Sequence, residues 1–267
     1  MMSLKTCIGA FLLCISGVLH AQTGVRERVV FYNTENLFDT RNDTLTADDD
    51  FTPRGKQHWN RERYTRKLLH ISKVLDNLGE GKFPLLIGLC EVENRDVVAD
   101  LANKTVLADA NYGIVHADSP DARGIDVALL YRKDSFRLSR NAFFPVHLKN
   151  GETTRDILYC EGIWGREDTL HIFVCHFPSM RGGESKSEWK RVEAASVVKQ
   201  KVDSIQGICP RAMILIMGDL NGRANTLAQK RLKIQNPESG AIQSENLYNT
   251  GYYLLGKPYG SYRYKGE

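Results

Sequence analysis

The chain has 267 residues, of which 42% are hydrophobic and 25% charged, values that are ordinary for a globular protein of one large domain or two small ones. Its formal net charge of +4 permits contact with a polyanion, but it lacks the strong basic excess of a dedicated nucleic-acid-binding protein. No internal repeat or low-complexity tract interrupts the sequence, and no segment after the first residues is apolar for long enough to cross a membrane.

The N-terminus has the pattern of a secretory signal peptide. Lys5 supplies a positive charge, residues 7–19 are apolar, and Ala21 stands at a suitable cleavage position before Gln22. About 13 apolar residues are short for a membrane anchor, so no stable membrane association is expected. The sequence therefore predicts a cleaved signal peptide over residues 1–21 and a periplasmic or extracellular protein.

The first predicted elements are a strand, a loop and a helix. The strand spans residues 26–33 and ends at Asn33. Residues 40–58 are polar and predict a long loop, in which the acidic run 48–50 is expected to be solvated. Asn60 is expected to cap a helix that runs to residue 78 and ends at Gly79. His70 is expected near the surface of this helix, whose apolar face contains Leu68, Ile71, Val74, Leu75 and Leu78.

The middle of the chain predicts several short strands and one helix. A strand over residues 84–90 is followed at once by Glu91, and a helix over 95–107 comes next. A two-stranded pair then turns near residues 165–168, and its second strand ends in His176. The strands predicted in this region lie near 112–116, 125–131, 135–139, 156–163 and 169–176.

The last predicted elements are a helix over residues 186–205, a strand over 213–217 and a helix near 224–233. Gly218 is expected to break the strand and let the backbone turn, so that Asp219 and Asn221 project from its carboxyl end. An Asx-rich turn with no further role would give the same residues. Strands and helices alternate in places and hairpins interrupt them, which favours an α/β protein with mixed sheets.

Six motifs, in order along the chain, resemble the endonuclease/exonuclease/phosphatase family, and in particular its secreted bacterial endonuclease-like members. This resemblance predicts a domain over residues 25–267 and a four-layer α/β sandwich of two packed mixed β-sheets flanked by helices. The motifs that carry it are Tyr32-Asn33-Thr34-Glu35-Asn36-Leu37-Phe38-Asp39, Cys90-Glu91-Val92-Glu93-Asn94, the segment from Asp121 to Tyr131, His176-Phe177-Pro178-Ser179, Gly218-Asp219-Leu220-Asn221, and Gly260-Ser261-Tyr262-Arg263-Tyr264.

The resemblance implies a metal site that acts on phosphate esters. Glu91 and Asn33 correspond to the family's metal-site residues, and Mg²⁺, with Mn²⁺ as an alternative, is the expected ion because it prefers oxygen ligands. Glu35 and Glu93 remain alternative ligands, since each lies two residues further along a strand that would face the same side. Solvated loop acids would account for these two glutamates equally well.

The remaining site residues are expected to handle the phosphate and the proton. His176, as an imidazolium, would contact a phosphate oxygen or protonate the leaving oxygen. Asp219 would orient the attacking water or a partner group, and Asn221 would donate its amide hydrogens to the phosphate. Substrate contacts are expected from Asn33, Arg155, Ser179 and Arg181, with Arg191 as a further candidate beside the Gly182-Gly183 loop.

The C-terminal sequence departs from the family pattern. Family members continue to an Asp-His pair whose histidine is the general base, but no histidine follows Asp219 here. The expectation is therefore a chain that lacks the last strand or strands of its sheet and that pair.

Four cysteines follow the signal peptide, and their spacing fits no metal-binding motif. A Cys160–Cys175 disulfide between neighbouring strands is one expectation for an exported protein. Buried free thiols are the other and the preferred one.

The expected function is metal-dependent hydrolysis of phosphodiester bonds by an exported, monomeric endonuclease that acts on nucleic acid. Two alternatives stay open. One is a phosphatase or phosphodiesterase for small phosphoesters of the inositol phosphate or sphingomyelin type, and the other is a catalytically impaired relative that binds phosphate without cleaving it.

Overall fold

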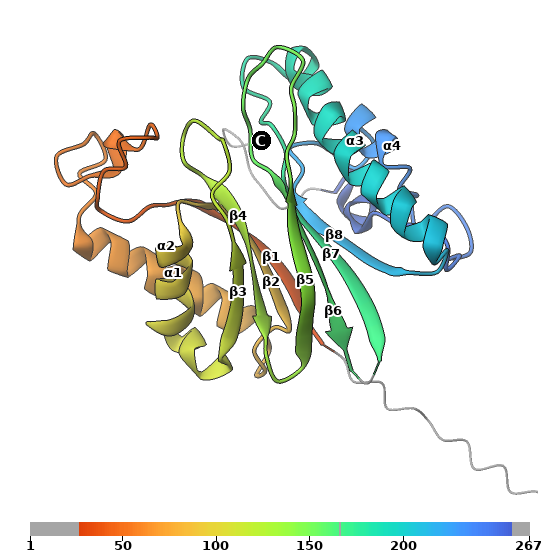
Figure 1. Ribbon diagram of the computed structural model, residues 1–267, viewed down its shortest axis with the longest axis horizontal. Coiled ribbons are helices and arrows are strands. Elements are labelled where there is room, and N and C mark those ends of the chain that lie inside the picture. Colours follow the sequence, from red (N-terminus) through yellow and green to blue (C-terminus); the bar gives the residue numbers. More distant parts are fainter. Residues whose placement is uncertain (1–26, 166, 258–267) are drawn as a thin grey trace, which may run out of the picture.

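The computed structural model describes residues 27–165 and 167–257. The predicted signal peptide and the Gly260–Tyr264 motif lie outside these residues. Two four-stranded sheets pack face to face, and helices cover the outer face of each, which gives the four layers seen in Figure 1. The predicted architecture of two packed mixed sheets flanked by helices is confirmed.

The first sheet has the strand order β1-β2-β4-β3. Its strands β1 and β2 are parallel, whereas β4 runs antiparallel to both β2 and β3. The bounds are β1 Val29–Leu37, β2 Leu86–Val92, β3 Tyr112–His116 and β4 Asp126–Arg132.

The second sheet has the order β5-β6-β7-β8, so its parallel pair stands last in the order, whereas that of the first sheet stands first. Here β7 and β8 are parallel, whereas β5, β6 and β7 form antiparallel neighbours. Each sheet therefore places one parallel pair beside two antiparallel strands. The bounds are β5 Phe136–Phe144, β6 Ile157–Trp164, β7 Asp168–His176 and β8 Met213–Asp219.

The helices bury the outer faces of the sheets (Figure 1). Helices α1 (Arg61–Leu78) and α2 (Arg95–Asn103) pack on the first sheet, where every second strand residue joins a core with their apolar faces. Helices α3 (Glu184–Ile208) and α4 (Leu227–Arg231) pack on the second sheet in the same way. The alternate residues of both sheets meet in a third core between them. Within the described part of the chain, no helix combines the length and apolar character needed to span a membrane.

Most predicted elements are present, and their caps follow the expected chemistry. The Asn60 side chain accepts a hydrogen bond from the Arg63 amide and begins α1, as predicted, and His70 is exposed on that helix. The predicted helix 95–107 was too long, because it ends at Asn103 and a separate 3₁₀ helix, Val106–Ala110, follows. The predicted helix 224–233 shrinks to the five residues of α4.

Two local predictions were wrong. Gly218 does not break its strand but lies inside β8, where a Cβ would sit 2.2 Å from the Cys175 carbonyl oxygen, so glycine permits the close approach of β7 and β8. The acidic run 48–50 is not fully solvated, because Asp48 is buried and accepts a hydrogen bond from the Asp43 amide.

A Cys160–Cys175 disulfide is excluded by the geometry of the second sheet. Cys160 lies opposite Ile172 and belongs to the core between the sheets, whereas Cys175 belongs to the core beneath α3. The two side chains therefore point to opposite faces, and no bond could join them without moving the backbone. Both thiols are free and buried, as the preferred alternative predicted, whereas Cys209 is exposed.

Candidate functional site

The candidate site lies where the carboxyl ends of two parallel strand pairs meet. On the second sheet, the register of β7 and β8 sets His176 directly opposite Asp219. On the first sheet, Asn33 of β1 lies opposite Cys90 of β2, and Glu91 follows. Parallel strands bring their carboxyl ends to one edge, so the sheet topology itself gathers these side chains.

One side-chain pair joins the two sheets at this edge. The Asn33 amide donates a hydrogen bond from Nδ2 to Asp219 Oδ2 over 3.1 Å. Asn33 Oδ1 accepts the Glu35 amide at 2.8 Å, and Asp219 Oδ1 accepts the Asn221 amide at 3.0 Å. Both side chains are thus held in one orientation, while each oxygen keeps a second lone pair for a ligand.

A second pair joins the sheets beside the first. His176 Nε2 lies 3.7 Å from Glu91 Oε1. His176 is almost fully buried, and this burial, followed by the positive charges of Arg155 and Arg123, lowers its pKa well below the usual value. The neutral imidazole is therefore the favoured form without a bound anion, and the predicted role of an imidazolium stays a prediction that requires proton uptake when an anion binds.

The backbone around these pairs is held in sparsely populated conformations. Glu35, Asn36, Glu91 and Asn221 have φ values of 53°, 65°, 59° and 46°, in the left-handed region that non-glycine residues rarely occupy. Residues keep such strained conformations only where contacts with the surrounding structure hold them, and they are concentrated at functional sites. The bend at Glu91 turns its side chain out of the strand alternation and toward His176.

Two nearby side chains hold this strained backbone in place. The Thr34 hydroxyl donates to the carbonyl oxygens of Cys90 and Glu91. The Lys67 ammonium, from α1, donates to the carbonyl oxygens of Glu35 and Asn36. Burial lowers the pKa of Lys67, while the nearby Glu35 and Glu91 charges oppose that shift. Sequence reasoning missed both contributions, because neither residue stands at a strand end.

Arg155 does not have the predicted role of a phosphate contact. Its guanidinium is buried and donates to Asp121 Oδ2 at 2.9 Å, to the His176 carbonyl oxygen at 3.2 Å and to the Phe177 carbonyl oxygen at 2.7 Å. Arg155 therefore positions the end of β7 from beneath. Arg191 is also fully buried and pairs with Glu188, so it is unavailable to a substrate.

The other predicted substrate contacts lie around the rim. Ser179 and Arg181 are exposed in the segment that follows β7, and the Ser179 hydroxyl accepts the Arg181 amide. The Asn221 side chain donates to the Phe177 carbonyl oxygen at 3.0 Å, which leaves its second amide hydrogen for a ligand. The roles of Ser179, Arg181 and Asn221 in substrate contact stay predictions.

Of the two alternative metal ligands, Glu93 is directed elsewhere. Glu35 is exposed at the site, but Glu93 is buried on the other side of the bend and accepts the Asp39 amide. Burial, with the nearby charges of Asp39, Asp48 and Asp43, raises the pKa of Glu93 to about 8. It belongs to a buried acidic group behind the site.

The raised pKa of Glu93 predicts a pH-dependent stability. Its folded pKa of about 8 exceeds the unfolded value of 4.5, so its contribution is fully present below pH 4.5 and is lost as the pH rises through 8. A Glu93→Gln variant keeps the uncharged form at every pH. We expect its free energy of unfolding in urea to fall less between pH 6 and pH 9 than that of the parent. The control is Glu238→Gln, at an exposed glutamate, which should behave like the parent. An equal fall in the free energy of unfolding in the parent and in Glu93→Gln would contradict the raised pKa of Glu93.

A groove that sequence reasoning missed opens beside the site. It is lined by Thr34 and Glu35 of β1, by Trp59 just before α1, and by Arg63, Arg66 and Lys67 in the first turns of α1. Arg63 and Lys67 lie over the Trp59 ring at 5.5 and 5.6 Å. The sequence contained this pattern, since Arg63, Arg66 and Lys67 recur at helical spacing along that helix.

The site's donor set fits a divalent cation. It consists of two carboxylates and one amide oxygen from three different strand ends, which are the ligands that a hard ion prefers. Within the described part of the chain, the Glu91 carboxylate accepts no hydrogen bond. Asn33, Glu91 and Asp219 are therefore the residues suited to hold a metal ion.

Comparison with known sequences agrees with this geometry. The sequence profile of the endonuclease/exonuclease/phosphatase family matches residues 28–267, so the chain belongs to that family. The family comprises hydrolases that act on phosphate esters. The search of curated proteins found no match.

Two solved structures with TM-scores above 0.5 show the same fold at low sequence identity. An endonuclease/exonuclease/phosphatase family protein from Bacteroides thetaiotaomicron is 13% identical, with a TM-score of 0.52 over 76% of this chain and 65% of that one. A functionally unknown conserved protein from Enterococcus faecalis V583 is 15% identical, with a TM-score of 0.51 over 77% and 71%. The human Nocturnin catalytic domain is 17% identical, with a TM-score of 0.47, and the match covers 60% of each chain.

Proposed function

We propose that this protein is an exported phosphodiesterase that depends on a divalent metal ion, Mg²⁺ or Mn²⁺, and cleaves nucleic acid. The observation that carries this proposal is the meeting of Asn33, Glu91, His176 and Asp219 from four strand ends, in two pairs that join the sheets. A solvated or structural role for each would not require all four to converge on one edge.

In this proposal the chain's residues divide the work of hydrolysis. A metal ion held by Asn33, Glu91 and Asp219 would act as a Lewis acid on the phosphate. Asp219, fixed by two hydrogen bonds, orients the attacking water. The neutral His176 donates its ring hydrogen to a phosphate oxygen, and the second amide hydrogen of Asn221 supports the charge that develops there.

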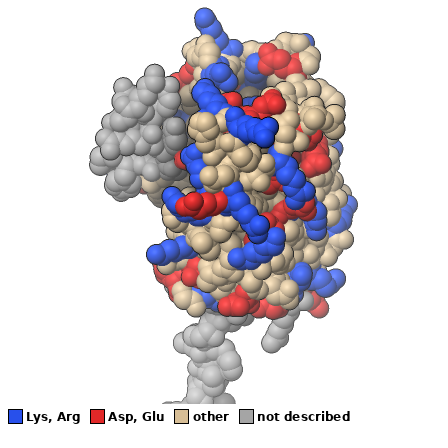
Figure 2. Space-filling view, turned by 90° about the vertical axis from the view of Figure 1, so that its left-hand side faces the viewer, with Lys and Arg blue, Asp and Glu red and all other residues tan. Residues whose placement is uncertain are grey.

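The groove beside the site supports nucleic acid as the substrate. Figure 2 looks onto the side of the molecule that carries α1 and shows Lys and Arg side chains gathered along it. In the groove, Arg63 and Arg66 are exposed, and Arg63 lies over the ring of the buried Trp59. Exposed basic side chains beside the site suit a polynucleotide whose phosphates continue past the cleaved bond.

Charge reversal in this groove is expected to weaken nucleic acid binding without altering the chemistry. We expect an Arg63→Glu/Arg66→Glu variant to bind single-stranded DNA at least tenfold more weakly. The slope of log affinity against log salt should fall by roughly 1.4, because two phosphate contacts to a single strand are lost. Hydrolysis of a small diester such as bis(p-nitrophenyl) phosphate should keep its rate.

The matched control is Lys73→Glu, which changes charge at an exposed position of the same helix outside the groove. If Arg63→Glu/Arg66→Glu and Lys73→Glu bind DNA with equal affinity, the groove does not bind the nucleic acid. A parallel loss of small-diester hydrolysis would show instead that the substitutions disturb the site through Lys67 and the Glu35–Asn36 backbone.

One observation favours small phosphoesters as the second candidate substrate. Arg63 also donates to the Gln57 carbonyl oxygen and Lys67 to two backbone carbonyls, so part of the groove's positive charge already serves the fold. Incubation with supercoiled plasmid and Mg²⁺, with and without a chelator, separates the candidates. Nicking that the chelator abolishes supports the nuclease, whereas phosphate release from small esters with intact plasmid supports the alternative.

Export and a monomeric state complete the proposal. The apolar N-terminal pattern of residues 7–19 motivates export. Expression of the full coding sequence, followed by cell fractionation and N-terminal sequencing, tests it: a mature chain that begins near residue 22 is expected. Detection only in the cytoplasm at full length would overturn this part.

A further inference from the structure

A second cluster of metal-ligating side chains lies on the opposite face of the first sheet. Strand β3 ends at His116 and β4 begins at Asp126, and His116 lies opposite Ala128 in the register. Ala128 points into the core beneath α1 and α2, so His116 and Asp126, two residues away, face that helical side as well. The cluster is thus separated from the Glu91–His176 pair by the sheet itself.

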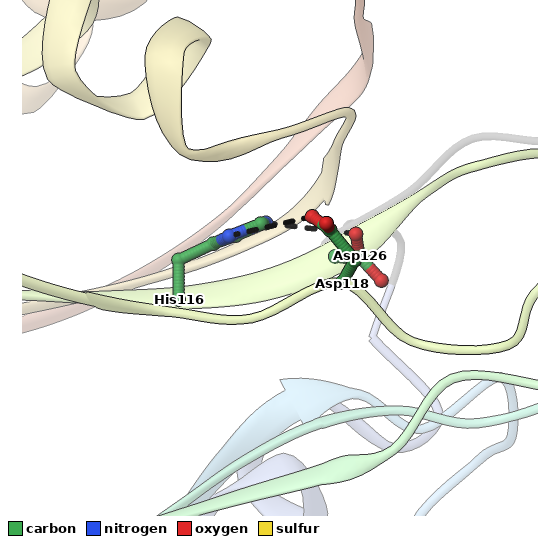
Figure 3. A group of neighbouring side chains, drawn as sticks. All are labelled: His116, Asp118 and Asp126. Atoms are coloured by element: carbon green, nitrogen blue, oxygen red, sulfur yellow. Dashed lines mark ion pairs between the residues drawn. The ribbon is translucent and has the colours of Figure 1, made fainter. Parts of the chain in front are cut away.

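Three side chains point toward one another in this cluster (Figure 3). His116 Nε2 lies 3.5 Å from Asp126 Oδ2, and His116 Nδ1 lies 4.0 Å from Asp118 Oδ1. One ligand atom from each residue lies within 4.8 Å of the other two. The His116 and Asp126 side chains are almost fully buried, whereas the Asp118 side chain is 85% exposed and able to adjust.

An unpartnered atom indicates that this cluster is built for a ligand. His116 Nε2 is buried and has no hydrogen-bond partner within the described residues, although it faces the Asp126 carboxylate. The other carboxylate oxygen, Asp126 Oδ1, is held by the amide and hydroxyl of Ser119. Asp126 Oδ2 is therefore fixed in its orientation and directed at the imidazole.

The spacing of these two atoms matches ligands of one ion better than a direct pair. A charged imidazole–carboxylate hydrogen bond closes to about 2.8 Å. Two ligands that bind a tetrahedral ion at about 2.1 Å each lie about 3.4 Å apart. The observed 3.5 Å between His116 Nε2 and Asp126 Oδ2 agrees with the second arrangement.

We infer that His116, Asp118 and Asp126 bind one divalent cation of the Zn²⁺ or Mn²⁺ class, with water completing the coordination. One imidazole with two carboxylates favours such borderline ions over Mg²⁺ and Ca²⁺, which take oxygen ligands. This cation is separate from the one proposed at Glu91, and the inference does not depend on the proposed function.

The position of the cluster gives the cation a structural role. Its three ligands enclose the β3–β4 connection, which carries Asp121, and Asp121 holds Arg155. Arg155 in turn donates to the carbonyl oxygens of His176 and Phe177. An ion that fixes the β3–β4 connection therefore stabilises the position of Asp121 and, through Arg155, the end of β7.

The test measures metal content and affinity in the chain without a histidine tag. In a Glu91→Gln background, which removes the first metal site, chelator-treated protein is dialysed against micromolar Zn²⁺ and analysed by elemental mass spectrometry. We expect one Zn²⁺ per chain, a rise in melting temperature, and no saturable uptake of Mg²⁺ or Ca²⁺ at the same concentration. Co²⁺ substitution should give the visible spectrum of a nitrogen–oxygen site.

Two variants and a control make the outcome decisive. Asp118→Asn alters an exposed side chain, leaves the core intact and should weaken Zn²⁺ binding at least tenfold. His116→Ala should abolish binding, while His70→Ala, at an exposed histidine on α1, should have no effect. Equal Zn²⁺ uptake in Asp118→Asn and in the unaltered background, or no uptake by either, would overturn the inference.

Discussion

A Glu91→Gln variant is expected to lose metal-dependent phosphodiester hydrolysis by at least about 100- to 1,000-fold, the cost of removing one charge-stabilising group from such a site. The reason lies in the arrangement of the site: Glu91 faces a neutral histidine and Asp219 is already engaged by two hydrogen bonds. Glutamine keeps the shape but removes the negative charge that a cation would require. Plasmid nicking and Mn²⁺ titration by paramagnetic resonance measure the two losses separately.

The matched control is Glu238→Gln, which removes an exposed carboxylate between α4 and the 3₁₀ helix Thr250–Leu254. It should keep the parent's activity and Mn²⁺ affinity. If Glu91→Gln instead keeps both within twofold, the metal is not held at this edge of the sheets, and the proposed function loses its central residue.

Loss of Arg155 is expected to have the largest effect on stability. Arg155→Met removes the buried partner of Asp121, whose remaining contacts are those from Arg123, and leaves the carbonyl oxygens of His176 and Phe177 without their Arg155 donor. Breaking a buried ion pair from one side costs about 3–5 kcal/mol. For a domain of this size that corresponds to a fall of roughly 6–20 °C in melting temperature. Thermal unfolding followed by circular dichroism measures it.

Two comparisons separate this effect from a general loss of charge. Arg140→Met breaks an ion pair with Glu161 at an arginine side chain that is 65% exposed, and it should cost less than about 1 kcal/mol. Asp121→Asn combined with Arg155→Met should recover part of the loss, because no unpaired charge then remains buried. If the melting temperature of Arg155→Met falls no further than that of Arg140→Met, the positioning role of Arg155 is refuted.

The sequence predicted the strand ends of the site because each apolar run stops at a polar residue with its own chemistry. Asn33, Glu91, His176 and Asp219 could be placed at one edge from this pattern and from the family resemblance alone. The cap at Asn60 was equally readable, since it depends on residues three apart. Local patterns of this kind need no knowledge of the tertiary structure.

What could not be predicted depends on contacts between distant segments. Arg155 stands among polar residues and resembles a surface arginine, and its burial follows from Asp121, which lies 34 residues away in the sequence. The left-handed bend at Glu91 depends on Thr34 of the neighbouring strand. Glu93 could not be separated from Glu91 by alternation, because that bend changes the face on which each side chain lies.

The two sheets repeat one pattern, and this gives the site a twofold character. In each sheet the parallel pair contributes one residue from its edge strand and one from the adjacent inner strand. The edge residues, Asn33 and Asp219, contact each other, and so do the inner residues, Glu91 and His176. Sliding one half of the molecule by an ångström would therefore separate both partnerships together, so substitutions in the apolar layer between the halves should tune reactivity from a distance.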